Sequence, residues 1–173
     1  MFEDIDPQLR KETIACVLQR SMNKSVVVYE GLLDEGGNLD PQKPVDVYWL
    51  DIDPATVAKN RKKGKMDDRE ELDFLGRTMA YGVKYQPHPT EEGAFVMSLV
   101  ALPKKAAVLK LIENGEKKKK PVVVMEIDGE DCYLKFIWVE LKTGMIGLPK
   151  VLYVKIKGIS IATGEEREET IKQ

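Results

Sequence analysis

The apolar residues of this chain are gathered in short runs, and the pattern is most regular in the second half. Between residues 94 and 161 five runs rich in Val, Ile and aromatic residues follow one another: FVMSLVAL, AAVLKLI, PVVVMEI, CYLKFIWVEL and VLYVKIKGISIA. Such residues favour strands. Only short polar breaks separate the runs, and strands with short connections pair antiparallel because a parallel return needs a long crossover. The second half is therefore predicted to be an antiparallel sheet.

The first half predicts further strands, and the whole pattern indicates a mainly β fold. The additional runs cover residues 14–19, 25–33, 45–52 and 83–87. The total is about eight or nine antiparallel strands, whose edges must be protected by closure or by a second sheet. We expect an antiparallel β-barrel or a barrel-like meander with one inserted α-helix. A β-sandwich is the alternative.

The inserted helix is predicted between the strands at 45–52 and 83–87. An Asp at position 67 or 68 can cap its first turn, and Gly82 is suited to end it. Three apolar residues fall at helical spacing and should be buried against the sheet: Leu72, Leu75 and Met79.

Two local signals concern the connections between strands. Asp128-Gly129 supplies the positive φ angles of a type I′ hairpin turn. In the run that follows position 150, Leu152, Val154 and Ile156 share one face, whereas the next apolar residues are Ile159 and Ile161. This shift of phase predicts a β-bulge at Lys157-Gly158.

Length, charge and termini indicate one soluble domain. The chain has 173 residues, 43% of them hydrophobic, so a single domain is expected over 1–173, with ends at 1–12 and 165–173 that are free to fray. The net charge of −2 gives no general attraction to nucleic acid or to anionic membranes. The N-terminal MFEDIDPQ lacks the features of a secretory signal, and no apolar run approaches the ~20 residues of a membrane span. We therefore expect a cytoplasmic protein.

No pattern indicates catalysis, a metal or a cofactor. His88 is the only histidine and lies between two prolines, so we interpret it as a loop residue. Zinc sites need several Cys or His ligands, and the acidic loop at 34–40 lacks the ligand spacing of an EF-hand. Asp51 and Asp53 end a strand and are expected to be solvated. We predict no catalytic or metal-binding residues and no cofactor.

Two basic runs carry enough charge to contact phosphates. They are Lys117–Lys120 and the stretch 61–65, and no aromatic residues interleave with them. Lysines beside apolar strands also prevent unwanted edge pairing. We favour this second role, and nucleic acid is not expected as a partner.

Polar and aromatic residues near strand ends form the best candidate site. Tyr48 and Trp49 are adjacent on one strand, so one of them faces the interior. Aromatic and Arg side chains around a cavity mouth are typical of barrels that bind small ligands, whereas ordinary core packing is the alternative. The candidates are Arg20, Ser21, Asn23, Lys24, Tyr29, Tyr48, Trp49, Arg77, Tyr81 and Trp138.

Three blocks of the sequence, RSMNKSVVVYEGLL, PVDVYWLDI and MAYGVKY, carry a resemblance to a known family. They resemble a family of small β-rich proteins from bacteria and single-celled eukaryotes that is known only as a domain of unknown function. The resemblance runs from about Arg20 to the last strand and implies no activity. It implies that family members look alike around Arg20, Ser21, Asn23, Lys24, Tyr48, Trp49 and Tyr81.

Three functions remain open. The first is non-enzymatic binding of a small apolar or amphipathic ligand in the barrel, which a continuous internal cavity would favour. The second is a protein-interaction module that uses a sheet edge or the basic loops, which a filled interior with an exposed apolar patch would favour. The third is an enzyme with a site near Asn23, Lys24 and Tyr48, and a lysine with a lowered pKa in a cleft would favour catalysis.

The chain contains two cysteines, Cys16 and Cys132, and both lie in apolar runs. We predict free thiols, so the melting temperature should be the same with and without reductant. A disulfide typically contributes about 2–4 kcal/mol, and a large fall in melting temperature on reduction would contradict this prediction.

Overall fold

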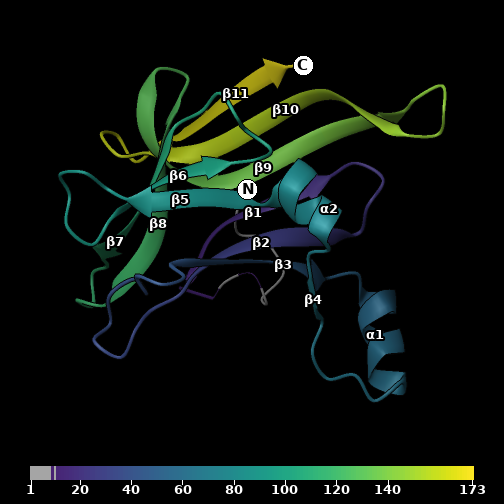
Figure 1. The fold of residues 1–173 in the computed structure, drawn as a ribbon, viewed down its shortest axis with the longest axis horizontal. Coiled ribbons are helices and arrows are strands. Elements are labelled where there is room, and N and C mark those ends of the chain that lie inside the picture. Colours follow the sequence, from purple (N-terminus) through teal and green to yellow (C-terminus); the bar gives the residue numbers. More distant parts are fainter. Residues whose placement is uncertain (1–8, 10) are drawn as a thin grey trace.

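Figure 1 shows the computed structural model, which describes residue 9 and residues 11–173. The expectation for residues 1–12 falls mainly outside this part of the chain. All nine predicted strands are present, and two more bring the described part to eleven. The strands are β1 (Ile14–Arg20), β2 (Ser25–Gly31), β3 (Val45–Asp51), β4 (Arg69–Glu71), β5 (Val83–Pro87), β6 (Phe95–Leu99), β7 (Ala107–Glu113), β8 (Lys119–Ile127), β9 (Glu130–Thr143), β10 (Pro149–Ser160) and β11 (Glu166–Lys172).

The eleven strands belong to a single, mostly antiparallel sheet. Its main path runs β4-β3-β2-β1-β9-β8-β7-β6-β5, and β10 and β11 continue from the other edge of β9. The pairing of β1 with β9 is parallel. The described sheet is not closed, because β4, β5 and β11 each have one free edge. The mainly β prediction is therefore confirmed, while closure into a barrel is not.

Strand β9 is the centre of this arrangement. One edge pairs with β10 from Cys132 to Thr143. The other edge is divided, since Glu130–Tyr133 pair with β8 and Phe136–Val139 pair with β1. Two strands that are far apart in the sequence are thus held against the same edge.

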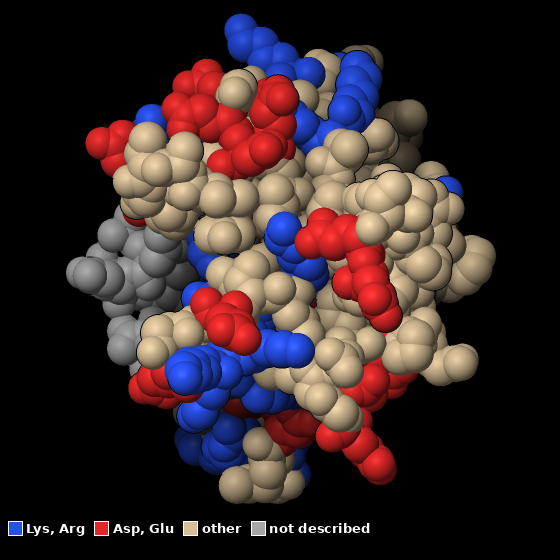
Figure 2. Space-filling view, turned by 90° about the vertical axis from the view of Figure 1, so that its left-hand side faces the viewer, with Lys and Arg blue, Asp and Glu red and all other residues tan. Residues whose placement is uncertain are grey.

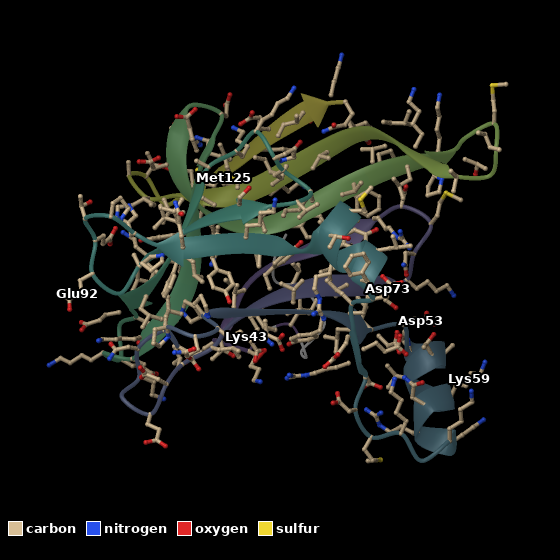
Figure 3. The ribbon with its side chains drawn as sticks, in the orientation of Figure 1. Lys43, Asp53, Lys59, Asp73, Glu92 and Met125 are labelled. Carbon is tan, nitrogen blue, oxygen red and sulfur yellow. The ribbon has the colours of Figure 1, made fainter. Side chains whose placement is uncertain are left out.

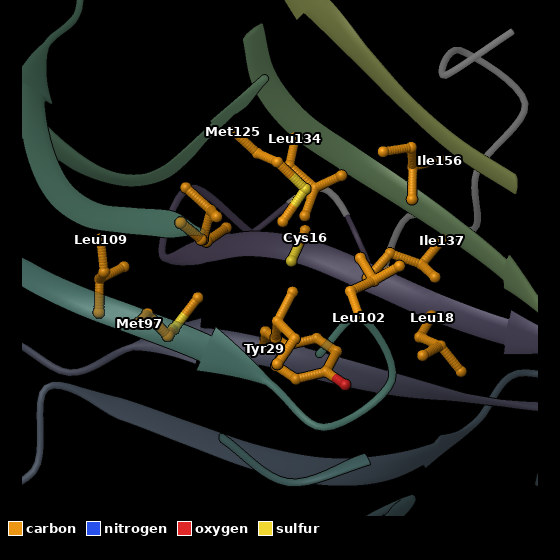
Figure 4. Close-up of a cluster of buried hydrophobic side chains, with 14 of the residues drawn as sticks. Cys16, Leu18, Tyr29, Met97, Leu102, Leu109, Met125, Leu134, Ile137 and Ile156 are labelled. Carbon is orange, nitrogen blue, oxygen red and sulfur yellow. The ribbon is translucent and has the colours of Figure 1, made fainter. Parts of the chain in front are cut away.

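The main core lies between two arms of the sheet, as Figure 4 shows. Cys16, Leu18 and Tyr29 come from β1 and β2, and they meet side chains of β6–β10. Fully buried members of the second group include Met97, Leu109, Met125, Leu134, Ile137 and Ile156. These residues occupy the interior in which a ligand cavity was expected. Both cysteines are buried in this core and free, as predicted.

A second, smaller core covers the opposite face of β1–β3. Val17, Val26, Val28, Tyr48 and Leu50 are buried there, and Phe136 of β9 packs against them. Both faces of β1 and β2 therefore carry buried residues.

The bulge predicted at Lys157-Gly158 is present, although the extra residue lies on the neighbouring strand. The register of β10 against β9 shifts between Lys157 and Gly158, and Lys135 of β9 is the residue left without a partner. Burial alternates along β10 without a break, so Gly158 and Ser160 face inward and Ile161 is exposed. The phase shift of the apolar residues therefore predicted the position of the bulge correctly. The reason for the prediction was wrong, because the bulge does not turn Ile161 inward.

The hairpin turn predicted at Asp128-Gly129 is confirmed. Asp128 and Gly129 have φ angles of 51° and 78°, as a type I′ turn requires. In the acidic loop the Asp34 carboxylate accepts hydrogen bonds from the backbone N–H groups of Gly36 and Asn38, and Gly37 has a φ of 77°. This loop is a connection between β2 and β3 that satisfies its own backbone groups.

The prediction for the helix at 67–82 is wrong in two respects. Residues 69–71 form β4, and helical structure starts later as α2 (Phe74–Gly76) and η2 (Arg77–Tyr81), capped by Asp73 (Figure 3). Leu72 is buried as expected, whereas Leu75 is 66% exposed and Met79 is 76% exposed. Leu72 lies before the helix begins, and the helical face that carries Leu75 and Met79 is turned to solvent.

Helix α1 (Pro54–Lys62) was not predicted at all. Pro54 lies in the first turn of this helix, which is capped by Asp53 (Figure 3), a position that tolerates proline. None of its residues is buried, so no apolar stripe could reveal it. Polar contacts hold it instead: Asn60 donates to Asp51, and Arg61 makes two hydrogen bonds to Asp68.

These contacts correct the interpretation of Asp51 and Asp53 as solvated carboxylates. Asp53 accepts hydrogen bonds from the N–H and hydroxyl of Thr56. Asp51 accepts from the Ser25 hydroxyl at 2.8 Å. Both carboxylates therefore hold neighbouring parts of the chain in place.

None of the described helices is long and apolar enough to cross a membrane.

The C-terminal residues 165–173 were expected to fray, but most of them form β11. This strand pairs with β10 from Glu166 to Lys172. Its charged side chains lie beside charges of the opposite sign on other strands. Glu168 lies 3.0 Å from the Lys155 ammonium, and Arg167 lies 3.0 Å from Glu130. Cross-strand pairs of opposite charge stabilise such an edge without apolar residues.

Gly158→Ala should destabilise the protein, because neighbouring atoms leave no room for a side chain at Gly158. An added Cβ would lie 2.6 Å from the Tyr133 carbonyl oxygen and 2.8 Å from Ile127 Cδ1. Overpacking of this kind typically costs about 1–3 kcal/mol. Gly115→Ala is the matched control, since nothing lies within 4 Å of its Cβ position. Urea unfolding that gives equal stabilities for both variants would contradict this packing.

Candidate functional site

Four of the predicted site residues meet in one cluster. The Arg20 guanidinium donates a 2.6 Å hydrogen bond to the Tyr81 hydroxyl and lies 5.4 Å from the centre of the Trp49 ring. Trp49 and Tyr81 pack edge to face at 5.1 Å, and the Tyr29 hydroxyl donates to the Tyr81 carbonyl oxygen at 2.8 Å. Trp49 is thus the inward-facing member of its pair. The cluster ties η2 to the sheet, which agrees with the core-packing interpretation of these residues.

Ser21, Asn23, Lys24 and Arg77 support the backbone around this cluster. The Ser21 hydroxyl accepts from the Leu141 N–H, and the Asn23 side chain accepts from the Ser25 N–H. Lys24 is exposed and forms a 3.7 Å ion pair with Asp53. Arg77 donates to the Leu72 carbonyl oxygen at 3.3 Å. Each of these residues has a structural partner.

Tyr48 and Trp138 lie away from the cluster. The Tyr48 hydroxyl donates to the buried carboxylate of Glu30 at 2.8 Å, and Arg69 covers its ring at 4.6 Å. Burial together with the Glu30 contact raises the pKa of Tyr48 well above its usual value. Trp138 alternates with the core residues Ile137 and Val139, so it points to the opposite face, where its indole N–H donates to Glu140 at 2.8 Å. Of the two tryptophans, Trp49 therefore packs against the main core and Trp138 does not.

The suggested enzyme site near Asn23, Lys24 and Tyr48 is not assembled as such. No hydrogen bond or ion pair among the described residues joins any two of the three. Tyr48 belongs to the second core, whereas Asn23 and Lys24 belong to the turn between β1 and β2.

A different set of residues forms the best-defined cleft that we find. It has a volume of about 330 Å³ and opens where β1 and β8 diverge from their shared edge of β9. Apolar side chains make up part of its wall, and Lys11, Lys120, Lys135, Glu12 and Asn114 supply the polar groups. The remaining lining residues are Leu9, Ile14, Ala15, Cys16, Val17 and Pro121. This volume falls within the ~300–1,000 Å³ typical of small-molecule sites.

Lys135 enters this cleft because of the irregularity in β9. It lies two positions after Tyr133, the last residue paired with β8, and directly before Phe136, the first paired with β1, and β10 skips it. Bulges often redirect a side chain next to a functional site. The side chain of Lys135 is half-buried, and its ammonium has no hydrogen-bond acceptor within the part of the chain that the structure describes.

The surroundings of Lys135 disfavour its positive charge. Burial lowers the pKa of Lys135 below its usual value, and the charge of Lys120 lowers it further. Two other charged side chains of the cleft already have partners. Lys11 forms a 3.2 Å ion pair with Glu30, and Glu12 accepts a hydrogen bond from Asn114. An anion in the cleft would relieve the repulsion between the two inner lysines.

The thiol of Cys16 lines the same cleft but is suited to packing rather than to reaction. Burial raises the pKa of Cys16 to about 12, so the thiol stays protonated near neutral pH. Burial likewise raises the pKa of Cys132. Reactive cysteines have a lowered pKa, and neither cysteine does.

His88 is a loop residue, as predicted, and the charges on one face of the molecule are mixed. Figure 2 shows one face of the molecule, where Lys and Arg side chains are interspersed with Asp and Glu rather than gathered into one field. His88 accepts hydrogen bonds through Nδ1 from the N–H groups of Thr90 and Glu91 and so organises its own loop. Among the described residues no cluster of His, Cys, Asp and Glu could hold a metal ion.

Comparison with known proteins gives one match. A family model described as a domain of unknown function (DUF4833) matches residues 16–170. The chain belongs to this family. The resemblance of the three sequence blocks is thereby confirmed. No curated protein and no solved structure matches the chain significantly.

The family match includes part of the cleft. Residues 16–170 contain Asn114, Lys120 and Lys135, whereas Leu9, Lys11 and Glu12 lie before the matched region. Sequence reasoning treated Lys120 as one of several surface lysines and gave Lys135 no role. The one signal for Lys135 was a charged residue inside the long apolar run CYLKFIWVEL.

Lys135→Met should stabilise the free protein at pH 7, because it removes a charge that the cleft disfavours. We expect a gain of about 0.5–2 kcal/mol in urea unfolding. Lys155→Met is the control and should give no gain, since Lys155 is paired with Glu168.

The pH dependence tests the same point. Folded Lys135 loses its proton at a lower pH than an unfolded lysine with a pKa of about 10.4, so below that pH the unfolded state binds more protons and stability rises with pH. Lys135→Met should lack this rise. Titration of Cys16 changes the stability in the opposite direction as the pH rises. The quantity to compare is therefore the difference in the free energy of unfolding between Lys135→Met and the unchanged protein at each pH. Parallel curves from pH 8 to 10 would show that Lys135 is fully solvated.

Proposed function

We propose that this protein is a non-enzymatic binding module for a small amphipathic anion. The ligand occupies the cleft between β1 and β8 with its negative group facing Lys135 and Lys120. The observation that carries this proposal is a half-buried lysine, without an ion-pair partner among the described residues, that lines a cleft of about 330 Å³. This is the ligand-binding function expected from the sequence, moved from a barrel interior to a cleft at the sheet surface.

The cleft is lined by both polar and apolar groups, which supports an amphipathic ligand. Lys120, Lys135 and Asn114 offer donors for a carboxylate or a phosphate, and charge-assisted hydrogen bonds are the stronger kind. Leu9, Ile14, Val17 and Pro121 offer apolar contact to a short hydrocarbon group. A simple inorganic anion would leave these apolar contacts unused.

Catalysis by Lys135 is the less favoured alternative. A lowered lysine pKa is a feature of amine catalysts, which also need a general acid or base in reach. The Cys16 thiol holds its proton, and the Glu12 carboxylate is exposed and accepts from Asn114. A binding role requires neither a nucleophile nor a base.

Titration calorimetry with octanoate tests the proposal. Its ten heavy atoms at roughly 0.5 kcal/mol each predict one site with a Kd on the order of 0.1–1 mM. Lys135→Met should weaken binding about 10–100-fold, the value of a charged hydrogen bond. Lys104→Met, at an exposed loop position outside the cleft, is the control and should bind normally.

Matched probes distinguish the contribution of the negative charge to binding from that of the hydrocarbon chain. Octyl phosphate should bind at least as well as octanoate, whereas octanol and inorganic phosphate should each bind much more weakly. Octanol binding equal to that of octanoate would show an apolar site without an anion requirement. Rapid and selective reductive alkylation of Lys135 by propanal and cyanoborohydride would instead favour amine catalysis.

A further inference from the structure

The hairpin between β9 and β10 ends in an apolar tip that the protein does not cover. Met145 is 106% exposed, Ile146 is 89% exposed and Leu148 is 70% exposed. The turn itself is ordered by backbone hydrogen bonds from Gly144 to Leu148 and from Gly147 to Gly144. Three large apolar side chains are thus presented together by a defined turn.

This tip stands away from the rest of the sheet. Pairing of β9 with β1 ends at Val139, and pairing of β10 with β11 begins at Tyr153. The residues between them form a two-stranded ribbon that projects past β1 and α2, as Figure 1 shows. The apolar tip therefore has free access to a large partner.

Two lysines lie directly behind the tip and face each other. Lys142 and Lys150 are cross-strand partners in the ladder of β9 and β10, so their side chains leave the same face of the ribbon. Both are exposed, and neither has an ion-pair partner in the described part of the chain. Like charges directly opposite each other destabilise a hairpin. An anionic partner outside the molecule would offset this cost.

We infer that the β9–β10 hairpin docks on anionic lipid bilayers. Met145, Ile146 and Leu148 enter the boundary between headgroups and acyl chains, and Lys142 and Lys150 contact the anionic headgroups. This surface is separate from the cleft of Lys135, so the inference does not depend on the proposed function.

The spacing along the ribbon suits this partner. Met145 is three positions beyond Lys142, which corresponds to at most about 10 Å at ~3.3 Å per residue. Interfacial segments bury their apolar side chains about 5–10 Å into the headgroup and acyl boundary. With the tip at this depth, the lysines lie at the level of the lipid phosphates.

A bilayer fits the tip better than a protein does. Stable protein interfaces bury about 20–30 residues on each side, whereas this tip offers three apolar side chains on a narrow ribbon. Lipid surfaces need no shape complementarity, and paired basic and apolar residues are what anionic membranes attract. The overall net charge of −2 does not oppose this, since the attraction is local to the two lysines.

Co-sedimentation of the full chain with vesicles tests the inference. The protein should bind vesicles of phosphatidylcholine with 30 mol% phosphatidylserine and should bind pure phosphatidylcholine vesicles at least tenfold more weakly. Met145→Ser/Ile146→Ser should weaken binding by at least roughly tenfold. Lys142→Gln/Lys150→Gln should weaken it about 25-fold, because each lysine near an anionic surface contributes about a fivefold factor. Salt at 0.5 M should have the effect of the lysine variant.

Met66→Ser is the matched control, because Met66 is an exposed methionine in the connection between α1 and β4. It should bind vesicles as the unchanged protein does. The tip variants should keep the original melting temperature, and the lysine variant should melt no lower, since it removes the repulsion between the two lysines. Binding that is absent, that is equal for both vesicle types, or that survives loss of the tip side chains would overturn the inference. So would self-association that the tip variants abolish, since the tip would then be a contact between copies of this chain.

Discussion

The fold depends on one edge of β9 that accepts two different strands. Ordinarily a strand edge pairs with a single neighbour, but here β8 takes Glu130–Tyr133 and β1 takes Phe136–Val139. The two neighbours run in different directions away from this edge, so the sheet splits into two arms that close over the main core. The cleft lies at that division, and Lys135 lies between the two paired segments of β9.

Much of the sheet could be predicted from the sequence, because its strands carry apolar runs of ordinary composition. The nine strands with such runs were recognised, and Asp128-Gly129 gave the turn between β8 and β9. Strands β4 and β11 were missed because charged side chains and ion pairs, not apolar burial, hold them to the sheet. Helix α1 was missed for the same reason, since Arg61 and Asn60 attach it through carboxylates. Hydrophobic patterning cannot report an element that buries nothing.

The candidate site was harder to predict because it is made by a contact between distant strands. Arg20, Trp49 and Tyr81 do meet, as their positions near strand ends suggested, but they complete the core instead of opening a cavity. Lys135 lies at the cleft because the strand that pairs with this edge of β9 changes from β8 to β1 at that position. A parallel pairing between β1 and β9 leaves no turn signal between the two strands, so no local pattern could place Lys135 beside Cys16.

The same parallel pairing has a consequence for how the chain reaches its native state. Val17 pairs with Phe136, so about 120 residues lie between partners that must meet, and contacts this distant in sequence slow folding. During synthesis at ~5–20 residues per second, β1 must wait roughly 6–24 s for β9 to emerge. Throughout that interval the apolar strands β1–β3 have no partner on the β1 side. The N-terminal half of this protein is thus the part most exposed to chaperones and to misassembly on the ribosome.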